Sequence, residues 1–192
     1  MEVLTMHQRR SGAFRQVAQW LVCALVFVAL QSPARAQSRE YQLKAAFLFQ
    51  FTKFVEWPEG SFASTNSPLV IGILGENPFE GALERLVEGE RVNGRPLILR
   101  QLEPDAAVDS VHVLFVARSE AGRAASLMRP LAGKPVLTVS DIEGFASRGG
   151  CAELFVDQNR IRFRVNPRTA GDARLSISSK LLRLADIVES PR

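Results

Sequence analysis

The chain has 192 residues, of which 46% are hydrophobic, and it carries 24 lysines and arginines against 20 aspartates and glutamates, a formal charge of +4. This length is enough for one domain with a substantial hydrophobic core. Two cysteines and two histidines are too few for a disulfide framework, and they show neither the paired cysteine spacing nor the histidine pair of a metal site.

The first segment has the pattern of a secretory signal peptide. A stretch with three arginines precedes a nearly unbroken apolar run over Val17–Leu30, which is shorter than the roughly 20 residues that a membrane-spanning helix needs. Ala34-Arg35-Ala36 then fits the small-x-small cleavage pattern. We expect cleavage after Ala36, so that residues 1–36 are a signal peptide and residues 37–192 form one exported domain. A retained membrane anchor is the alternative.

Removal of the signal peptide changes the charge and the cysteine count. Four arginines and one glutamate lie in the first 36 residues, so the exported part carries 20 basic and 19 acidic side chains. This nearly neutral balance gives no support for nucleic-acid binding. Cys151 is then the single cysteine, so an internal disulfide cannot form although a compartment outside the cytoplasm would allow one.

The first predicted element of the exported domain is a helix over Glu40–Val55. Apolar side chains recur there at helical spacing, and Trp57-Pro58 end the helix because the residue before proline avoids the helical region. The stripe consists of Leu43, Ala46, Phe47, Gln50, Phe51 and Phe54. We expect this stripe to face the core, with a membrane or partner surface as the alternative.

Short apolar strands alternate with helices through the middle of the domain. The predicted strands are Leu69–Leu74, Pro96–Leu102, Val111–Ala117 and Val136–Ser140. One helix is expected from the cap-then-proline pair Asn77-Pro78 to about Val87, and another over Glu120–Met128 with Ser119 as its cap. This alternation favours a mostly parallel sheet with helices packed on it.

The pattern changes after residue 151. Ala152–Asp157 and Arg160–Val165 are predicted strands separated only by Gln158-Asn159, which suits the two-residue turn of an antiparallel hairpin. Asn166-Pro167 repeats the cap-then-proline signal, and the apolar residues between Leu181 and Val188 predict a C-terminal helix. The predicted fold is therefore a single α/β domain, a mostly parallel sheet flanked by helices with a C-terminal antiparallel hairpin.

Groups suited to catalysis are scarce. His112 is the only histidine after residue 36, and within an apolar strand a packed side chain is the common outcome. Cys151 is expected to be a buried free thiol. The loop Gly75–Gly81 joins a strand to a helix but has neither the dinucleotide glycine pattern nor the P-loop lysine. The sequence predicts no catalytic residue, no metal site and no cofactor.

The expected hairpin register places one aromatic side chain among charges. One face carries the pairs Asp157–Arg160, Phe155–Arg162 and Glu153–Arg164. The other face is apolar and carries Leu154, Val156, Ile161, Phe163 and Val165. The first face allows two interpretations. It is a set of cross-strand salt pairs with Phe155 under an arginine, or Phe155, Arg162 and Arg164 form a site for a protein partner.

Short segments along the exported domain match one known family in order. They are Leu43–Phe49, Phe54–Pro58, Gly75–Phe79, Leu137–Asp141, Gly144–Ala146 with Gly149-Gly150, Arg162-Phe163, Val165-Asn166 and Ile177–Ala185. This ordered set covers nearly the whole exported part and resembles the YfiR-like family of periplasmic repressors.

The resemblance implies a regulator and not an enzyme. Its best-known branch binds the periplasmic sensor region of a membrane-bound diguanylate cyclase, lowers cyclic-di-GMP signalling and so restrains biofilm formation, and an outer-membrane lipoprotein can sequester it. These two proteins are the implied partners, and a second copy of the chain is a third candidate. The cysteine pairs of the best-known member are missing, because Cys151 stands alone. A small-molecule sensor that uses the loop Gly75–Phe79 is the alternative function.

Overall fold

A computed structural model describes residues 33–103 and 110–189. The apolar run of the expected signal peptide lies outside these residues, whereas residues 33–36 begin the helix α2 (Pro33–Phe54). The chain divides into two compact units, residues 1–39 and residues 40–192, and the fold that follows is that of the second unit. None of the helices in the two described ranges has the length and apolarity needed to cross a membrane.

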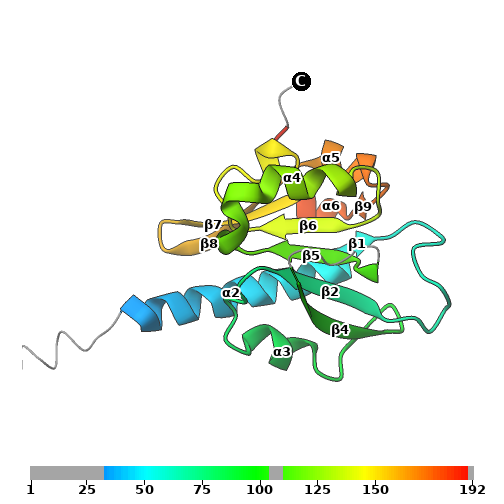
Figure 1. Ribbon diagram of the computed structural model, residues 1–192, viewed down its shortest axis with the longest axis horizontal. Coiled ribbons are helices and arrows are strands. Elements are labelled where there is room, and N and C mark those ends of the chain that lie inside the picture. Colours follow the sequence, from blue (N-terminus) through cyan, green and yellow to red (C-terminus); the bar gives the residue numbers. More distant parts are fainter. Residues whose placement is uncertain (1–32, 104–109, 190–192) are drawn as a thin grey trace, which may run out of the picture. The chain divides into compact units, whose positions relative to one another are not determined.

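Within the described residues, the second unit is built on a mixed sheet of eight strands (Figure 1). In spatial order they are β10 (Asp186–Ile187), β8 (Arg160–Val165), β7 (Ala152–Asp157), β6 (Leu137–Ser140), β5 (Val113–Val116), β2 (Leu69–Leu74), β4 (Arg95–Leu102) and β3 (Arg91–Val92). The strands from β4 to β7 run parallel, and β8 pairs antiparallel with β7. A small antiparallel pair joins β1 (Val55–Glu56) to β9 (Ser176–Ile177). The predicted fold class is confirmed.

Helices cover both faces of this sheet. They are α3 (Ala82–Val87), α4 (Ala124–Met128), α5 (Pro167–Asp172) and α6 (Ser179–Leu182), with α2 and α4 on opposite sides of β5 and β6 (Figure 1). Alternate residues of β2 enter the two cores: Ile71 and Ile73 join one, Val70 and Leu74 the other. A strand buried on both faces needs an unbroken apolar run, which is why Leu69–Leu74 was predictable as a strand.

The predicted core face of α2 is confirmed for its aromatic residues, because Phe51 is buried and Phe47 and Phe54 pack against the core, but it is wrong at its other positions. Of the expected stripe Phe51 is buried, but Leu43 is 47% exposed and Gln50 is exposed. The buried residues of α2 are Tyr41, Lys44, Ala45, Leu48, Phe49, Phe51 and Thr52. Two of these are polar, and both have partners: Lys44 binds Asp141, and the Thr52 hydroxyl donates to the Phe49 carbonyl at 2.6 Å. An apolar pattern alone misses a face that buries satisfied polar groups.

Three other predicted helices differ from the observed ones. α3 begins at Ala82 rather than at Pro78, after Gly81 in the left-handed conformation. The expected helix Glu120–Met128 is a 3₁₀ segment, Arg118–Arg123, followed by α4. The C-terminal helix ends at Leu182, where the chain turns, leaves Leu184 76% exposed and then pairs with β8 as β10. Long-range strand pairing has overridden the local helical spacing there.

Candidate functional site

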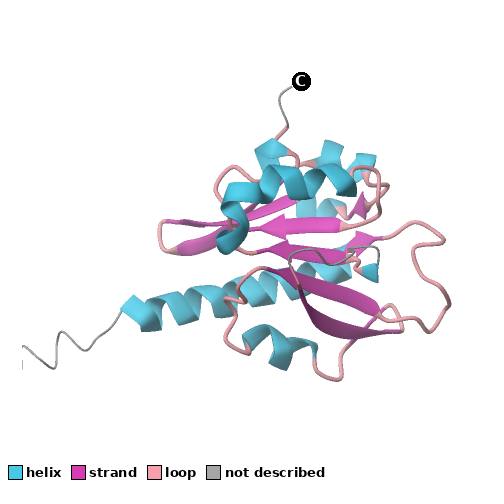
Figure 2. Cartoon of the chain, in the orientation of Figure 1, coloured by secondary structure: helices cyan, strands magenta, loops and turns pink. Residues whose placement is uncertain are grey.

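The β7–β8 hairpin has the register that the sequence predicts. Phe155 lies opposite Arg162, and Glu153 lies opposite Arg164. The two turn residues, Gln158 and Asn159, have φ angles of 46° and 63°, as expected for the tight turn that matches the twist of an antiparallel pair. In Figure 2 the turn end of the hairpin extends beyond α4. The hairpin is therefore not covered by α4 near its turn.

The apolar face of the hairpin packs on α2. Phe163 is 4% exposed, and its ring centroid lies 5.2 Å from that of Phe51 and 5.6 Å from that of Phe47. Toward the turn this cover ends, and Val156 on the same face is 47% exposed. Phe163 is therefore a core residue as predicted, whereas Val156 is an exposed apolar residue beside it.

The opposite face holds Phe155 under two arginines. The Arg164 guanidinium carbon lies 3.9 Å from the Phe155 ring centroid, and that of Arg162 lies 5.9 Å away. The Phe155 side chain is half-buried. A guanidinium over an aromatic face is a favourable cation–π arrangement. The three predicted site residues are thus brought together in one contiguous cluster.

The arginines of this face also form ion pairs. Arg164 Nη1 lies 2.6 Å from Oε1 of Glu153, whose side chain is buried. Arg162 bridges Asp157 at 2.7 Å and Asp186 of β10 at 2.6 Å, and its hydrogen bond to Asp157 raises the pKa of the guanidinium. Because carboxylates already hold both arginines in place, the aromatic ring is presented in a rigid, charge-balanced frame.

The residue types of this face are those found in protein–protein interfaces. An aromatic ring flanked by guanidinium groups is the composition of interface anchors. Besides Phe155 the face carries carboxylates and guanidinium groups, and it has no thiol, hydroxyl or imidazole. Salt pairing and cation–π contact, the first interpretation, are observed; partner binding stays a prediction.

Two backbone amides of the loop Gly75–Phe79 have hydrogen-bond partners within the protein. The Glu76 amide donates to Ser119 Oγ at 2.9 Å, and the Phe79 amide donates to Asn77 Oδ1 at 3.0 Å. A Cβ on Gly75 would lie 2.4 Å from Ser119 Oγ, so glycine is needed for this close approach. These two amides are therefore already used and are not available to bind an anion in the manner of a phosphate loop.

His112 is a packed structural residue, as expected. Its Nδ1 accepts from the Val70 amide at 3.1 Å, its Nε2 lies 3.1 Å from the Ser61 carbonyl, and its ring stacks on Phe62 at 4.3 Å. Burial lowers the pKa of His112, so the neutral ring with the proton on Nε2 fits this site. Cys151 is a buried free thiol, and burial raises its pKa.

A buried ion pair that the sequence did not reveal joins α2 to the end of β6. Lys44 Nζ lies 2.7 Å from Asp141 Oδ2, and both side chains have no exposed surface. The same oxygen accepts from the Tyr41 hydroxyl at 2.9 Å and lies 3.1 Å from Arg118 Nε. Burial, and then the charge of Asp141, raise the pKa of Tyr41. The only sign of this pair in the local sequence is Lys44 itself, which interrupts the apolar helix face that carries Tyr41 and Leu48.

Comparison with known proteins gives one informative result. The family model described as YfiR/HmsC-like (DUF4154) matches residues 41–186. No curated protein matches the chain. In the described ranges, no group of three or more histidine, cysteine, aspartate or glutamate side chains is arranged to hold a metal ion. The matched segment contains nearly all of the second unit, including the hairpin and the Lys44–Asp141 pair.

Proposed function

The chain belongs to the YfiR/HmsC-like family, and we propose that it is a periplasmic negative regulator that binds the sensor region of an inner-membrane diguanylate cyclase and lowers cyclic-di-GMP signalling. Membership of the family suggests periplasmic regulation of such signalling. Two points go beyond family membership and are proposed: that the bound protein is a diguanylate cyclase, and that binding lowers its signalling.

The observation that carries the proposal is the charged face of the hairpin. Phe155 lies under Arg164 and beside Arg162, on an element whose turn end is not covered by α4 (Figure 2). Ion pairs fix both arginines before any partner arrives, so little side-chain freedom is lost on binding. We assign the contact with the cyclase to Phe155, Arg162 and Arg164.

The proposal includes export. Residues 1–36 are proposed to be removed as a signal peptide, which leaves residues 37–192 in the periplasm, where the sensor region of the cyclase is exposed. Intact-mass measurement of periplasmic protein should give a chain that begins at Gln37. Retention of residues 1–36 in a membrane fraction would contradict export by cleavage. An outer-membrane lipoprotein that sequesters the regulator, and pairing of two copies, belong to the same proposal.

The functional experiment compares two neighbouring side chains on opposite faces of the hairpin, the half-buried Phe155 and the exposed Val156. Phe155→Ala should abolish repression in a cyclic-di-GMP reporter strain while the protein accumulates normally. Val156→Ala is the matched control, because Val156 is the next residue, is 47% exposed and points to the other face. Equal repression by both variants would contradict the assignment of this face.

The arginines need different substitutions. Arg162 is exposed and its two ion pairs are at the surface, so Arg162→Glu should weaken repression with little effect on folding. Arg164 neutralises the buried Glu153 carboxylate, and a glutamate there would leave two carboxylates unpaired. Arg164→Lys keeps the charge and removes the planar contact with Phe155, which makes it the informative variant.

A further inference from the structure

Residues 57–68 join β1 to β2 and contain neither helix nor strand, and in Figure 1 they form the long loop between these two strands. We call them the β1–β2 loop. Two backbone hydrogen bonds close turns within it, from the Ser61 amide to the Pro58 carbonyl at 3.1 Å and from the Ser67 amide to the Ser64 carbonyl at 3.3 Å. Because these bonds do not reach the sheet, the position of the loop depends on the side chains that attach it there.

His112 attaches the β1–β2 loop to the sheet. It directly precedes β5 and is 8% exposed. Its Nε2 lies 3.1 Å from the Ser61 carbonyl oxygen, and the Phe62 ring stacks on its imidazole with the ring centroids 4.3 Å apart. The Trp57 indole nitrogen donates to the His112 backbone carbonyl at 3.2 Å. Three residues of the loop therefore contact this one histidine.

Arg95 of β4 holds the same loop by a second set of contacts. Its guanidinium carbon lies 3.7 Å from the Phe62 ring centroid, a favourable cation–π arrangement. Its Nη1 donates to the carbonyls of Ser64 at 2.7 Å and Ser67 at 3.0 Å. Phe62 thus contacts both the imidazole and a permanent positive charge, which is compatible only with a neutral imidazole at low cost.

The hydrogen bonds of His112 also require the neutral ring. Its Nδ1 accepts from the Val70 amide at 3.1 Å, so a second proton would have to bind the nitrogen that faces this N–H. Protonation would break the bond and leave a buried amide without its acceptor, which is costly.

The charges around the imidazole act in the same direction. The charged side chains on the described elements around it are Arg95 and Arg100 of β4, Glu56 of β1 and Glu59 of the loop, since β2 and β6 contain none. Burial, and more weakly the charge of Arg95, lower the pKa of His112 from its ordinary value of 6.5, although the hydrogen bond to Ser61 opposes them.

We propose that His112 is an acid-sensitive switch, in which protonation of Nδ1 releases the β1–β2 loop from the sheet while the rest of the domain stays folded. In the released form the imidazole is solvated and takes up its proton near pH 6.5, before the closed form does. The ratio of open to closed molecules therefore rises by up to about tenfold for each pH unit below 6.5. Release uncovers the rings of Trp57 and Phe62, which pack against the core in the closed form. The switch goes beyond regulation through the hairpin and does not depend on it.

The test uses a probe that the exported protein already carries, because Trp57 is the only tryptophan after residue 36 and contacts His112 directly. Quenching of its fluorescence by acrylamide, which is uncharged, is measured between pH 7.5 and 5 on the purified exported protein. The quenching constant should rise as the pH falls below 6.5, while the far-UV circular dichroism stays unchanged. Quenching that does not change with pH would overturn the proposal, and so would a loss of circular dichroism over the same range, because the whole domain would then unfold.

Three variants assign the response to His112. His112→Gln removes the titrating group, so its quenching should not depend on pH. Glu59→Gln is the matched control, because Glu59 is the only other titratable side chain of the loop, and it should keep the natural response. Phe62→Leu removes the ring that stacks on His112, so the response should move to higher pH.

A pH response that persists in His112→Gln, or one that is lost in Glu59→Gln, would overturn the proposal. If His112→Gln does not fold, Phe62→Leu decides the matter, since a response at the natural pH in that variant would also overturn it. Every result is read from the loop itself, so loss of the proposed repressor function would leave the switch standing.

Discussion

Replacing Lys44 by methionine should destabilise the domain by about 3 kcal/mol, at the lower end of the roughly 3–5 kcal/mol that breaking a buried ion pair costs. Methionine keeps much of the side-chain volume but removes the ammonium group that lies 2.7 Å from Asp141. The lower end applies because the Tyr41 hydroxyl and Arg118 still contact the same carboxylate oxygen. Asp141 Oδ1 has no hydrogen-bond partner in the described residues, so the carboxylate depends strongly on the contacts that remain.

The second substitution in the cycle is Asp141→Asn. In the double variant neither buried charge remains, and the loss should fall to about 1 kcal/mol, since replacing both members of a buried pair is often close to neutral. Lys53→Met is the control: Lys53 is an exposed lysine on the same helix, and surface changes usually stay within about 0.5 kcal/mol.

Urea unfolding at pH 7 measures the free energy of unfolding of the natural protein, the two single variants, the double variant and the control through the linear extrapolation. A loss below about 1 kcal/mol for Lys44→Met, or additive losses in the double variant, would refute the claim that this pair is buried and coupled.

Three further predictions concern the core, the histidine and the cysteine. Phe163→Ala should lower the free energy of unfolding by about 3–5 kcal/mol while Phe155→Ala costs about 1 kcal/mol or less; equal losses in urea curves would mean that the faces are misassigned. Stability should fall as the pH drops below 6.5, because burial lowers the folded-state pKa of His112 from that value and the unfolded chain takes up the proton first. Urea midpoints between pH 7.5 and 5 should show this slope, His112→Gln should flatten it, and a natural protein without the slope would contradict the buried neutral ring. Dithiothreitol should leave the melting temperature unchanged, since Cys151 is a buried free thiol; a drop would reveal a disulfide between two copies.

The hairpin was predictable because its signals are local. Two residues that tolerate positive φ, Gln158 and Asn159, fix the turn, and a two-residue turn fixes the whole register of β7 and β8. Once the register is set, alternation decides that Phe163 is buried and that Phe155 is not. The cap of α5 was equally local, because Asn166 and Thr169 are one turn apart.

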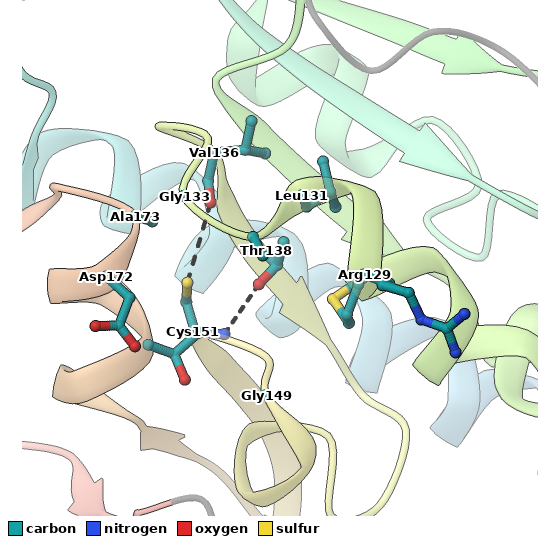
Figure 3. Close-up of a pocket in the computed structure, with 12 residues that line it drawn as sticks. Arg129, Leu131, Gly133, Val136, Thr138, Gly149, Cys151, Asp172 and Ala173 are labelled. Carbon is teal, nitrogen blue, oxygen red and sulfur yellow. Dashed lines mark hydrogen bonds between the residues drawn. The ribbon is translucent and has the colours of Figure 1, made fainter.

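The errors arose where distant residues decide the structure. Lys44 is buried because it pairs with Asp141. This partner lies 97 positions away in the sequence, so the local pattern around Lys44 does not reveal the pair. The segment after Leu182 has helical spacing, yet it becomes β10 because β8 offers it a free edge. A pocket whose lining residues are spread along the chain from Met128 to Ala173 (Figure 3) could not be predicted either. Each case depends on tertiary contacts that propensity does not encode.

The most direct test of the central claim is a calorimetric titration of the purified exported domain with the periplasmic region of the cyclase. The account predicts binding by the natural protein, binding within a factor of about two for Val156→Ala, and a loss of about 30-fold or more for Phe155→Ala, the factor that corresponds to a hot spot of about 2 kcal/mol. A Phe155→Ala variant that is folded and binds the cyclase as tightly as the natural protein would contradict it.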